Sequence, residues 1–184
     1  MSTGGYKIWN KDGIHFITFA VVEWVDVFTR KEYRDIVLDS IRHCQAERGL
    51  VLYSWCLMSN HIHMVVSAKN ADTSEILRDF KRFTSKKLVA AISDNVQESR
   101  KAWMLEIFKK AGAANSRNTG YQFWRQDNQP KECYSKEFTE QKLEYIHNNP
   151  VEAGIVECAE DYLYSSARDY YNTGKGLLDV ELLI

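Results

Sequence analysis

Two strand-like segments separated by only three residues constrain this chain most strongly. Residues 50–57 and 61–66 are both rich in apolar and β-branched side chains, which favour strands. Because only residues 58–60 connect them, we expect the two strands to pair as an antiparallel hairpin. Side chains alternate between the faces of a strand, so His61 and His63 point to one face while the residue between them points into a core.

The order of the remaining elements predicts the sheet. Residues 14–22 favour a first, central strand and residues 121–125 a fourth, preceded by a mobile loop over 111–120. Helices are predicted before and after the hairpin, over about 30–48, 72–88 and 94–110. This order is that of an α+β fold with a ferredoxin-like, split βαβ antiparallel sheet and its helices on one face. The other face, which would bear His61 and His63, is then free to form a site.

Capping residues set the predicted helix boundaries. Thr29 and Asp72 each precede a glutamate by three residues, the capping-box pattern that opens a helix. Gly49 suits the end of the first helix. Ser135 can cap the last helix, which Pro150 is expected to stop. The candidate core residues of the second helix are Ile76, Leu77, Phe80, Phe83 and Leu88.

Composition limits the class of protein. The 184 residues, 45% hydrophobic and 27% charged, fit one domain over 1–184 with a C-terminal extension at about 155–184. No signal-peptide stretch and no bilayer-length apolar run occurs, so we expect a cytoplasmic protein with no membrane partner. Four scattered cysteines indicate reduced thiols. The net charge of −1 gives no general attraction to nucleic acid, so a DNA partner requires a local cationic surface.

The histidine pair admits two interpretations. Two imidazoles one strand repeat apart can bind a single divalent cation, but His61 and His63 can equally be half-buried residues with structural hydrogen bonds. A histidine-triad nucleotide hydrolase requires a third histidine where Val65 stands. A structural zinc site requires two more Cys or His ligands close by in the sequence, and none is there.

A second segment offers a nucleophile and a further ligand. Tyr145 and Asn149 are four residues apart on the last predicted helix, so they share one stripe. Each has a structural alternative, as a core phenol or as a helix cap. A phenol is a poor nucleophile at neutral pH, and a cation held by the histidines would polarise a phosphate that it attacks. The amide oxygen of Asn149 suits Mg²⁺ or Mn²⁺, so the combination suggests chemistry on a phosphodiester.

These segments resemble the active-site motifs of the single-tyrosine transposases of the HUH endonuclease superfamily. Met-Ser-Asn-His-Ile-His at 58–63 is similar to that family's Met-Pro-Asn-His-Val-His, with Ser59 in place of the usual proline. Tyr-Ile-His-Asn-Asn-Pro-Val-Glu-Ala-Gly at 145–154 is similar to a stretch of the REP-associated tyrosine transposases. Residues 123–126 and 164–170 also look like elements of that subgroup.

The resemblance implies a metal-dependent endonuclease and transposase that recognises hairpin DNA of palindromic repeats and cleaves single-stranded DNA beside it. Tyr145 would form a 5′-phosphotyrosine intermediate, and His61, His63 and Asn149 would hold Mg²⁺ or Mn²⁺. Such a protein would act in DNA transposition and recombination at the nucleoid, as a monomer or as a homodimer. A hairpin-binding regulator that does not cleave, and a hydrolase of small phosphoesters, are the alternatives.

Basic and aromatic residues predict where the DNA lies. Within ten residues the second helix carries five cations against the single acid Asp79: Arg78, Lys81, Arg82, Lys86 and Lys87. Lys and Arg neutralise phosphates, although a solvated helix face is the structural alternative. Trp124 can stack on an unpaired base, or pack in the core, and Arg125 can hold a phosphate. Arg168 is a further candidate contact to the DNA backbone.

Overall fold

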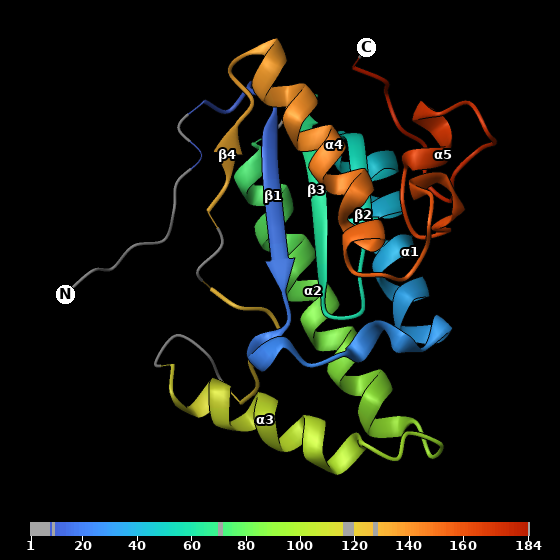
Figure 1. Ribbon diagram of the computed structural model, residues 1–184. Helices are drawn as coiled ribbons and strands as arrows, with labels where there is room; N and C mark the ends of the chain where they lie inside the picture. The colour runs from blue at the N-terminus through green and yellow to red at the C-terminus, as the bar shows by residue number, and fades with distance from the viewer. Residues whose placement is uncertain (1–7, 9, 70–71, 116–119, 127–128, 184) are drawn as a thin grey trace.

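The computed structural model describes residues 8, 10–69, 72–115, 120–126 and 129–183 (Figure 1). The strands are β1 (His15–Ala20), β2 (Leu50–Leu57), β3 (His61–Ala68) and β4 (Lys131–Glu132). The α-helices are α1 (Lys31–Arg48), α2 (Thr73–Asp94), α3 (Lys101–Ala113), α4 (Lys136–Glu152) and α5 (Ala167–Tyr170). Short 3-10 helices are η1 (Val22–Trp24), η2 (Val27–Thr29) and η3 (Ala159–Asp161). Among the helices described, none combines the length and the hydropathy that a membrane span requires.

The four strands form one antiparallel sheet in the order β2-β3-β1-β4. The predicted hairpin is confirmed: β2 and β3 are joined by residues 58–60, and the Met58 N–H donates to the carbonyl of His61 at 2.9 Å. On the other side of β3, Thr18 of β1 lies opposite His63. This strand order and pairing confirm the predicted α+β, ferredoxin-like sheet.

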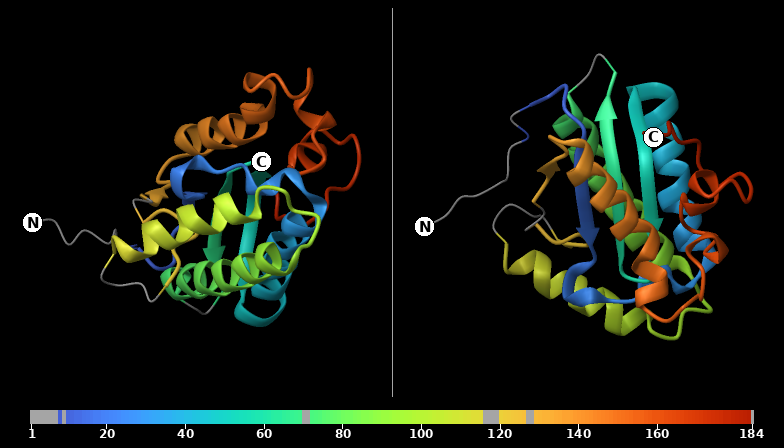
Figure 2. Two further views of the ribbon diagram at one scale, coloured as in Figure 1. Left: turned by 90° about the horizontal axis from the view of Figure 1, so that it is seen from below. Right: turned by 45° about the horizontal axis from the view of Figure 1, so that its top comes forward.

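Helices cover both faces of the sheet rather than one (Figure 2). The main core contains side chains of α1 and α2 packed against one face, as predicted. On the other face lies α4, which buries Leu143 and Ile146 against Phe16 of β1 and Val65 of β3. The face that bears the histidines is therefore covered by the helix that bears Tyr145, whose apolar stripe is buried there.

Three of the predicted helix caps are confirmed. Gly49 follows α1 with a left-handed backbone (φ +72°), a conformation that glycine adopts without strain. The Asp72 side chain accepts a hydrogen bond from the Ser74 N–H at 2.9 Å at the start of α2. Ser135 accepts from the Phe138 N–H at 3.1 Å and so caps α4.

Other boundaries differ from prediction. Thr29 does not cap α1, which begins at Lys31 after Arg30 with no side-chain cap. The third helix starts at Lys101, later than predicted, and extends to Ala113, into the predicted loop over 111–120. Residues 116–119 of that loop lie outside the described part. Residues 121–125 are not the fourth strand that the sequence predicts: they contribute a single bridge, from Trp124 to Val21, and the strand that pairs with the outer side of β1 is β4.

Two predictions based on local rules are wrong. Pro150 does not stop α4, which continues to Glu152, because a proline in the last turns removes only one backbone hydrogen bond and its ring is buried here. Phe83 is not a core residue: it is 53% exposed, because the buried stripe of α2 passes through Phe80 and Thr84 instead.

The segment after α4 runs along the outer edge of β2. The Leu57 N–H donates to the Tyr164 carbonyl at 2.8 Å, and the Ser166 N–H donates to the Trp55 carbonyl at 3.0 Å. Farther along, the Glu181 N–H donates to the Leu52 carbonyl at 2.9 Å. The predicted C-terminal extension thus hydrogen-bonds to backbone groups that an edge strand would otherwise expose.

A buried histidine joins α4 to this segment. His147 Nε2 lies 2.9 Å from Ser166 Oγ and 3.2 Å from Ser54 Oγ, and only 3% of the residue is exposed. Burial lowers the pKa of His147 from 6.5 to about 4, so the imidazole is neutral in the folded protein at neutral pH.

We therefore expect stability to fall with pH below 6.5, where the unfolded chain takes up a proton that folded His147 does not bind until near pH 4. Between pH 7 and pH 5 this one group should cost about 2 kcal/mol of unfolding free energy. Urea unfolding at both pH values measures the loss. His147→Gln, which keeps a polar partner for Ser166 but does not titrate, should show a loss smaller by that amount. An equal loss in both proteins would contradict the assignment.

Candidate active site

The two histidines of β3 face α4, on the same side of the sheet, as the strand pattern predicts. The ring centroids of His61 and His63 are 4.6 Å apart, with the ring planes at 72°. His63 also stacks on Phe16 of β1, with centroids 5.6 Å apart. The two imidazoles therefore form a compact pair backed by an aromatic ring.

Hydrogen bonds fix which nitrogen of each ring is left for a ligand. The Asn60 side chain donates from Nδ2 to the Trp24 carbonyl at 3.2 Å, which turns its oxygen toward His61. That oxygen lies 2.7 Å from His61 Nδ1, and because an amide oxygen only accepts, His61 Nδ1 carries the proton. His63 Nδ1 lies 2.7 Å from Thr18 Oγ1. In both rings Nδ1 is engaged, so Nε2 is the nitrogen available to bind a cation.

Both histidines are in the neutral form that binds metals. Burial is the largest cause that lowers the pKa of His63 to about 3, and the neighbouring His61 imidazole and Lys142 ammonium lower it further, because protonating His63 would place like charges together. Burial also lowers the pKa of His61, an effect opposed by a hydrogen bond with the Asn149 side chain. His63 Nε2 is buried and has no hydrogen-bond partner among the described residues. A buried imidazole nitrogen without a partner is costly unless it has a ligand to bind.

Tyr145 of α4 lies directly beside the pair. Its ring centroid is 5.1 Å from that of His63 and 6.0 Å from that of Phe16. The residue is 40% exposed, so the phenol is accessible to a substrate rather than enclosed in the core. One turn later, the Asn149 side chain is in hydrogen-bonding reach of His61. The structure therefore brings together all four residues predicted for the catalytic and metal site, within one polypeptide.

The donor atoms at this site, two imidazole nitrogens and one amide oxygen, can hold a divalent cation. No cluster of three or more His, Cys, Asp or Glu side chains that could hold a metal occurs in the described part of the chain. A cation at His61, His63 and Asn149 would have two imidazole nitrogens and one amide oxygen, and further positions would be taken by water or substrate oxygens. The unpartnered Nε2 of His63 fits such a ligand role.

Sequence reasoning missed three supporting residues. Thr18 could not be assigned because its contact with His63 depends on the register of β1 against β3. Asn60 lies in the connection of the hairpin, and nothing in the sequence indicates that it orients His61. Lys142, whose ammonium lies 5.7 Å from the Tyr145 ring centroid, was detectable: three residues before Tyr145, it lies on the same side of the helix.

The predicted DNA-binding cations of α2 lie on the helix that covers the opposite face of the sheet. Arg78 and Arg82 pair with Asp79, at 3.5 and 3.3 Å, and Lys86 and Lys87 are exposed. Lys81 differs, because its ammonium donates to the carbonyl of Arg125 at 2.9 Å. Most of this basic group is therefore separated from the histidines by the sheet.

Trp124 is a core residue and does not offer a base-stacking surface in this structure. It is 3% exposed, its indole N–H donates to Thr84 Oγ1 at 2.9 Å, and its ring stacks on Phe28. Arg125, by contrast, lies over the Trp24 ring at 5.2 Å. Arg168 donates from Nε to the Glu160 carbonyl at 2.9 Å, within the C-terminal segment.

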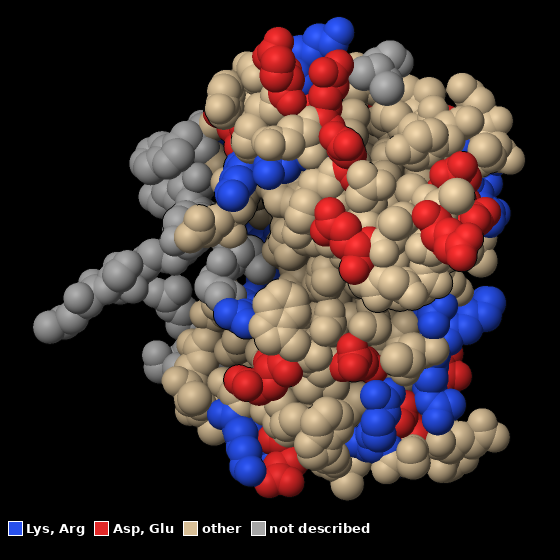
Figure 3. Space-filling view, in the orientation of Figure 1, with Lys and Arg blue, Asp and Glu red and all other residues tan. Residues whose placement is uncertain are grey.

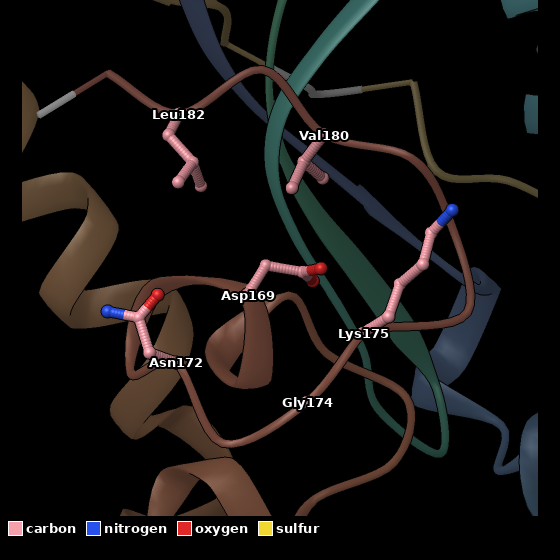
Figure 4. A pocket seen from close by; sticks show the side chains of 6 residues that line it. All are labelled: Asp169, Asn172, Gly174, Lys175, Val180 and Leu182. Atoms are coloured by element: carbon pink, nitrogen blue, oxygen red, sulfur yellow. The ribbon is translucent and has the colours of Figure 1, made fainter.

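The surface and its pockets do not by themselves mark the site. On the face that carries α4, acidic and basic side chains are interspersed (Figure 3). A pocket of ≈ 380 Å³ belongs to the C-terminal segment and is lined by Asp169, Asn172, Gly174, Lys175, Val180 and Leu182 (Figure 4). A second, of ≈ 520 Å³, has Glu23, Gln122 and Arg125 in its lining. The histidine pair lines neither of these pockets, so the site is recognised by its side-chain geometry.

Comparison with solved structures agrees with the fold. A REP-associated tyrosine transposase bound to a REP hairpin superposes with a TM-score of 0.65 at 16% sequence identity, covering 100% of this chain and 99% of that one. A structure described as a "putative transposase" from Deinococcus radiodurans R1 gives a TM-score of 0.46 at 15% identity, covering 80% and 97% of the two chains. No curated protein sequence matches the chain.

Comparison with family models identifies the family. The model for IS200-like transposases matches residues 13–109 of the 184, which include the histidine pair but not Tyr145. The resemblance to a transposase family is thereby confirmed. The chain belongs to the family of IS200-like transposases, which are DNA-processing enzymes.

Proposed function

We propose that this transposase is a metal-dependent endonuclease that recognises hairpin DNA and cuts single-stranded DNA beside it, using Tyr145 as the nucleophile. One observation carries the proposal: the Tyr145 ring lies 5.1 Å from the ring of His63, whose buried Nε2 has no hydrogen-bond partner among the described residues. The hairpin partner is supported by the shared fold of a REP-associated transposase whose structure contains a REP hairpin.

His61, His63 and Asn149 are the residues that would hold Mg²⁺ or Mn²⁺. When bound, such a cation supplies positive charge that polarises the phosphate oxygens and stabilises the charge of the transition state. The chain itself keeps the imidazoles neutral by burial and orients them through Thr18 and Asn60.

The chemical step is a transesterification. The phenol oxygen of Tyr145 attacks the phosphorus, forming an O–P bond, while the bond from phosphorus to the 3′ oxygen breaks. The phenol loses its proton to solvent and the departing 3′ oxygen gains one, so the products are a 5′-phosphotyrosine and a free 3′ hydroxyl. Lys142 places a positive charge 5.7 Å from the Tyr145 ring centroid, close to the phosphate whose negative charge increases during attack.

Tyr145→Phe is expected to abolish covalent capture of a labelled hairpin with a single-stranded flank, because only the attacking oxygen is removed. Hairpin binding should stay nearly unchanged. Denaturing gels read the adduct, and electrophoretic mobility shifts read binding. Tyr134→Phe is the matched control, since Tyr134 is an exposed tyrosine just before α4 and should still form the adduct. A stable adduct with Tyr145→Phe would refute the assignment. Metal-independent binding with no nicked product in the wild type would favour a regulator that does not cleave.

Replacing both His61 and His63 by Ala should lower cleavage by more than about 100-fold, because the ligands for the cation are lost. Excess EDTA should have the same effect on the wild type. Added Mn²⁺ should restore cleavage by the EDTA-treated wild type but not by the double-Ala variant. Isothermal titration with Mn²⁺ measures the site directly. His43→Ala, at an exposed histidine of α1, is the control that should bind and cleave as the wild type does. Undiminished cleavage in EDTA would exclude the metal.

Thr18→Val removes the hydroxyl that orients His63 while keeping the shape of the side chain. We expect Mn²⁺ affinity to fall by about 10-fold or more, the usual effect of losing a hydrogen bond to a metal-binding histidine. Thr18→Ser keeps the hydroxyl and should retain the affinity. Equal affinities of the Val and Ser variants would show that the contact at 2.7 Å has no role in the site.

A further inference from the structure

An exposed indole lies against the proposed metal site. Trp24, in η1, is 49% exposed, and its ring centroid is 5.8 Å from that of His61 with the planes at 81°. The indole therefore stands next to a proposed ligand while about half of the residue remains accessible. A large aromatic surface in this position is available to a substrate that binds at the histidines.

The backbone holds this indole in a conformation that is costly without support. Glu23 and Trp24 both have left-handed backbones, with φ of +51° and +53°. Non-glycine residues persist there only when their surroundings enforce it, and such residues concentrate at functional sites. Here the Trp24 N–H donates to the Val21 carbonyl at 3.1 Å, and the Trp24 carbonyl accepts from Asn60 Nδ2. Since the same Asn60 amide orients His61, indole and imidazole are placed by one side chain.

Positive charge accompanies the indole. The Arg125 guanidinium lies over the Trp24 ring at 5.2 Å, and the Lys81 ammonium donates to the Arg125 carbonyl. These contacts lead from the basic helix α2, around the end of β1, to Trp24 and His61. A single strand that follows this path would meet cations for its phosphates and an aromatic surface for a base, the combination found in proteins that bind single strands.

We propose that Trp24 stacks on the unpaired nucleobase next to the phosphate that Tyr145 attacks, with Arg125 at the adjoining backbone phosphate. The inference rests on the proposed function and deepens it, because it assigns the residue that positions the strand for cutting. Every base presents a π-face, so the contact should require an unpaired base without selecting its identity.

Binding measurements with abasic DNA test the proposal. The probe is a hairpin with a single-stranded flank in which each flank position in turn lacks its base. For the wild type, we expect affinity to fall about 10-fold at one position beside the cleaved phosphate. Trp24→Ala should weaken binding of intact DNA by a similar factor and show no further loss with that abasic probe. Trp24→Phe should retain most of the affinity and Trp24→Leu should not.

Controls separate this proposal from folding and from the proposed function. Trp103→Ala, at an indole of α3 that is 52% exposed, should bind every probe as the wild type does, and thermal unfolding verifies that each variant is folded. Two results would overturn the stacking contact. One is that Trp24→Ala binds DNA as tightly as the wild type. The other is that the abasic probes weaken binding by the same factor in Trp24→Ala as in the wild type at every position. Absence of a covalent adduct in the wild type would refute the proposed function, whereas absence of coupling between Trp24 and any flank position would refute the stacking contact, so the two failures are distinguishable.

Discussion

The burial of the apolar stripe of α4 against the sheet is the interaction on which the site depends. Leu143 and Ile146 pack on Phe16 and Val65, and this contact sets the rotation of α4 about its axis. Tyr145 lies between those two anchors in the sequence, so the rotation that buries them leaves the phenol beside His63 and partly exposed. The packing that holds α4 on the sheet therefore also sets the position of the proposed nucleophile, Tyr145.

Burial sets the protonation state of the two histidines, and hydrogen bonds set the orientation of their rings. Burial keeps them uncharged, and neighbours at Nδ1 direct each ring. A solvent-exposed pair would have neither property, since water would stabilise the protonated forms and leave the rings free to rotate. Burial at the α4 interface therefore gives two neutral imidazoles, the form in which histidine could bind the proposed cation.

Most helices and strands, and the histidine motif of β3, could be predicted from the sequence because they depend on local periodicity and on residue type. Alternation along 61–66 was enough to place His61 and His63 on one face, and helical spacing was enough to join Tyr145 to Asn149. Contacts between segments that are distant in the sequence could not be predicted from these local patterns. Thr18 meets His63 only through strand register, and the burial of Trp124 depends on Phe28 and Thr84, which belong to other elements. The position of Trp24 could not be predicted for a different reason: nothing in the surrounding sequence indicates a left-handed backbone there.

The pairing of the C-terminal segment with β2 has a consequence for how molecules of this protein meet. Unpaired strand edges invite strand addition from other chains, which leads to swapped dimers and to aggregates. Here the chain supplies its own partner at Leu52, Trp55 and Leu57. The segment after α4 thus occupies the edge at which another chain could add a strand, and its removal would expose that edge together with the buried imidazole of His147, which loses its partner Ser166.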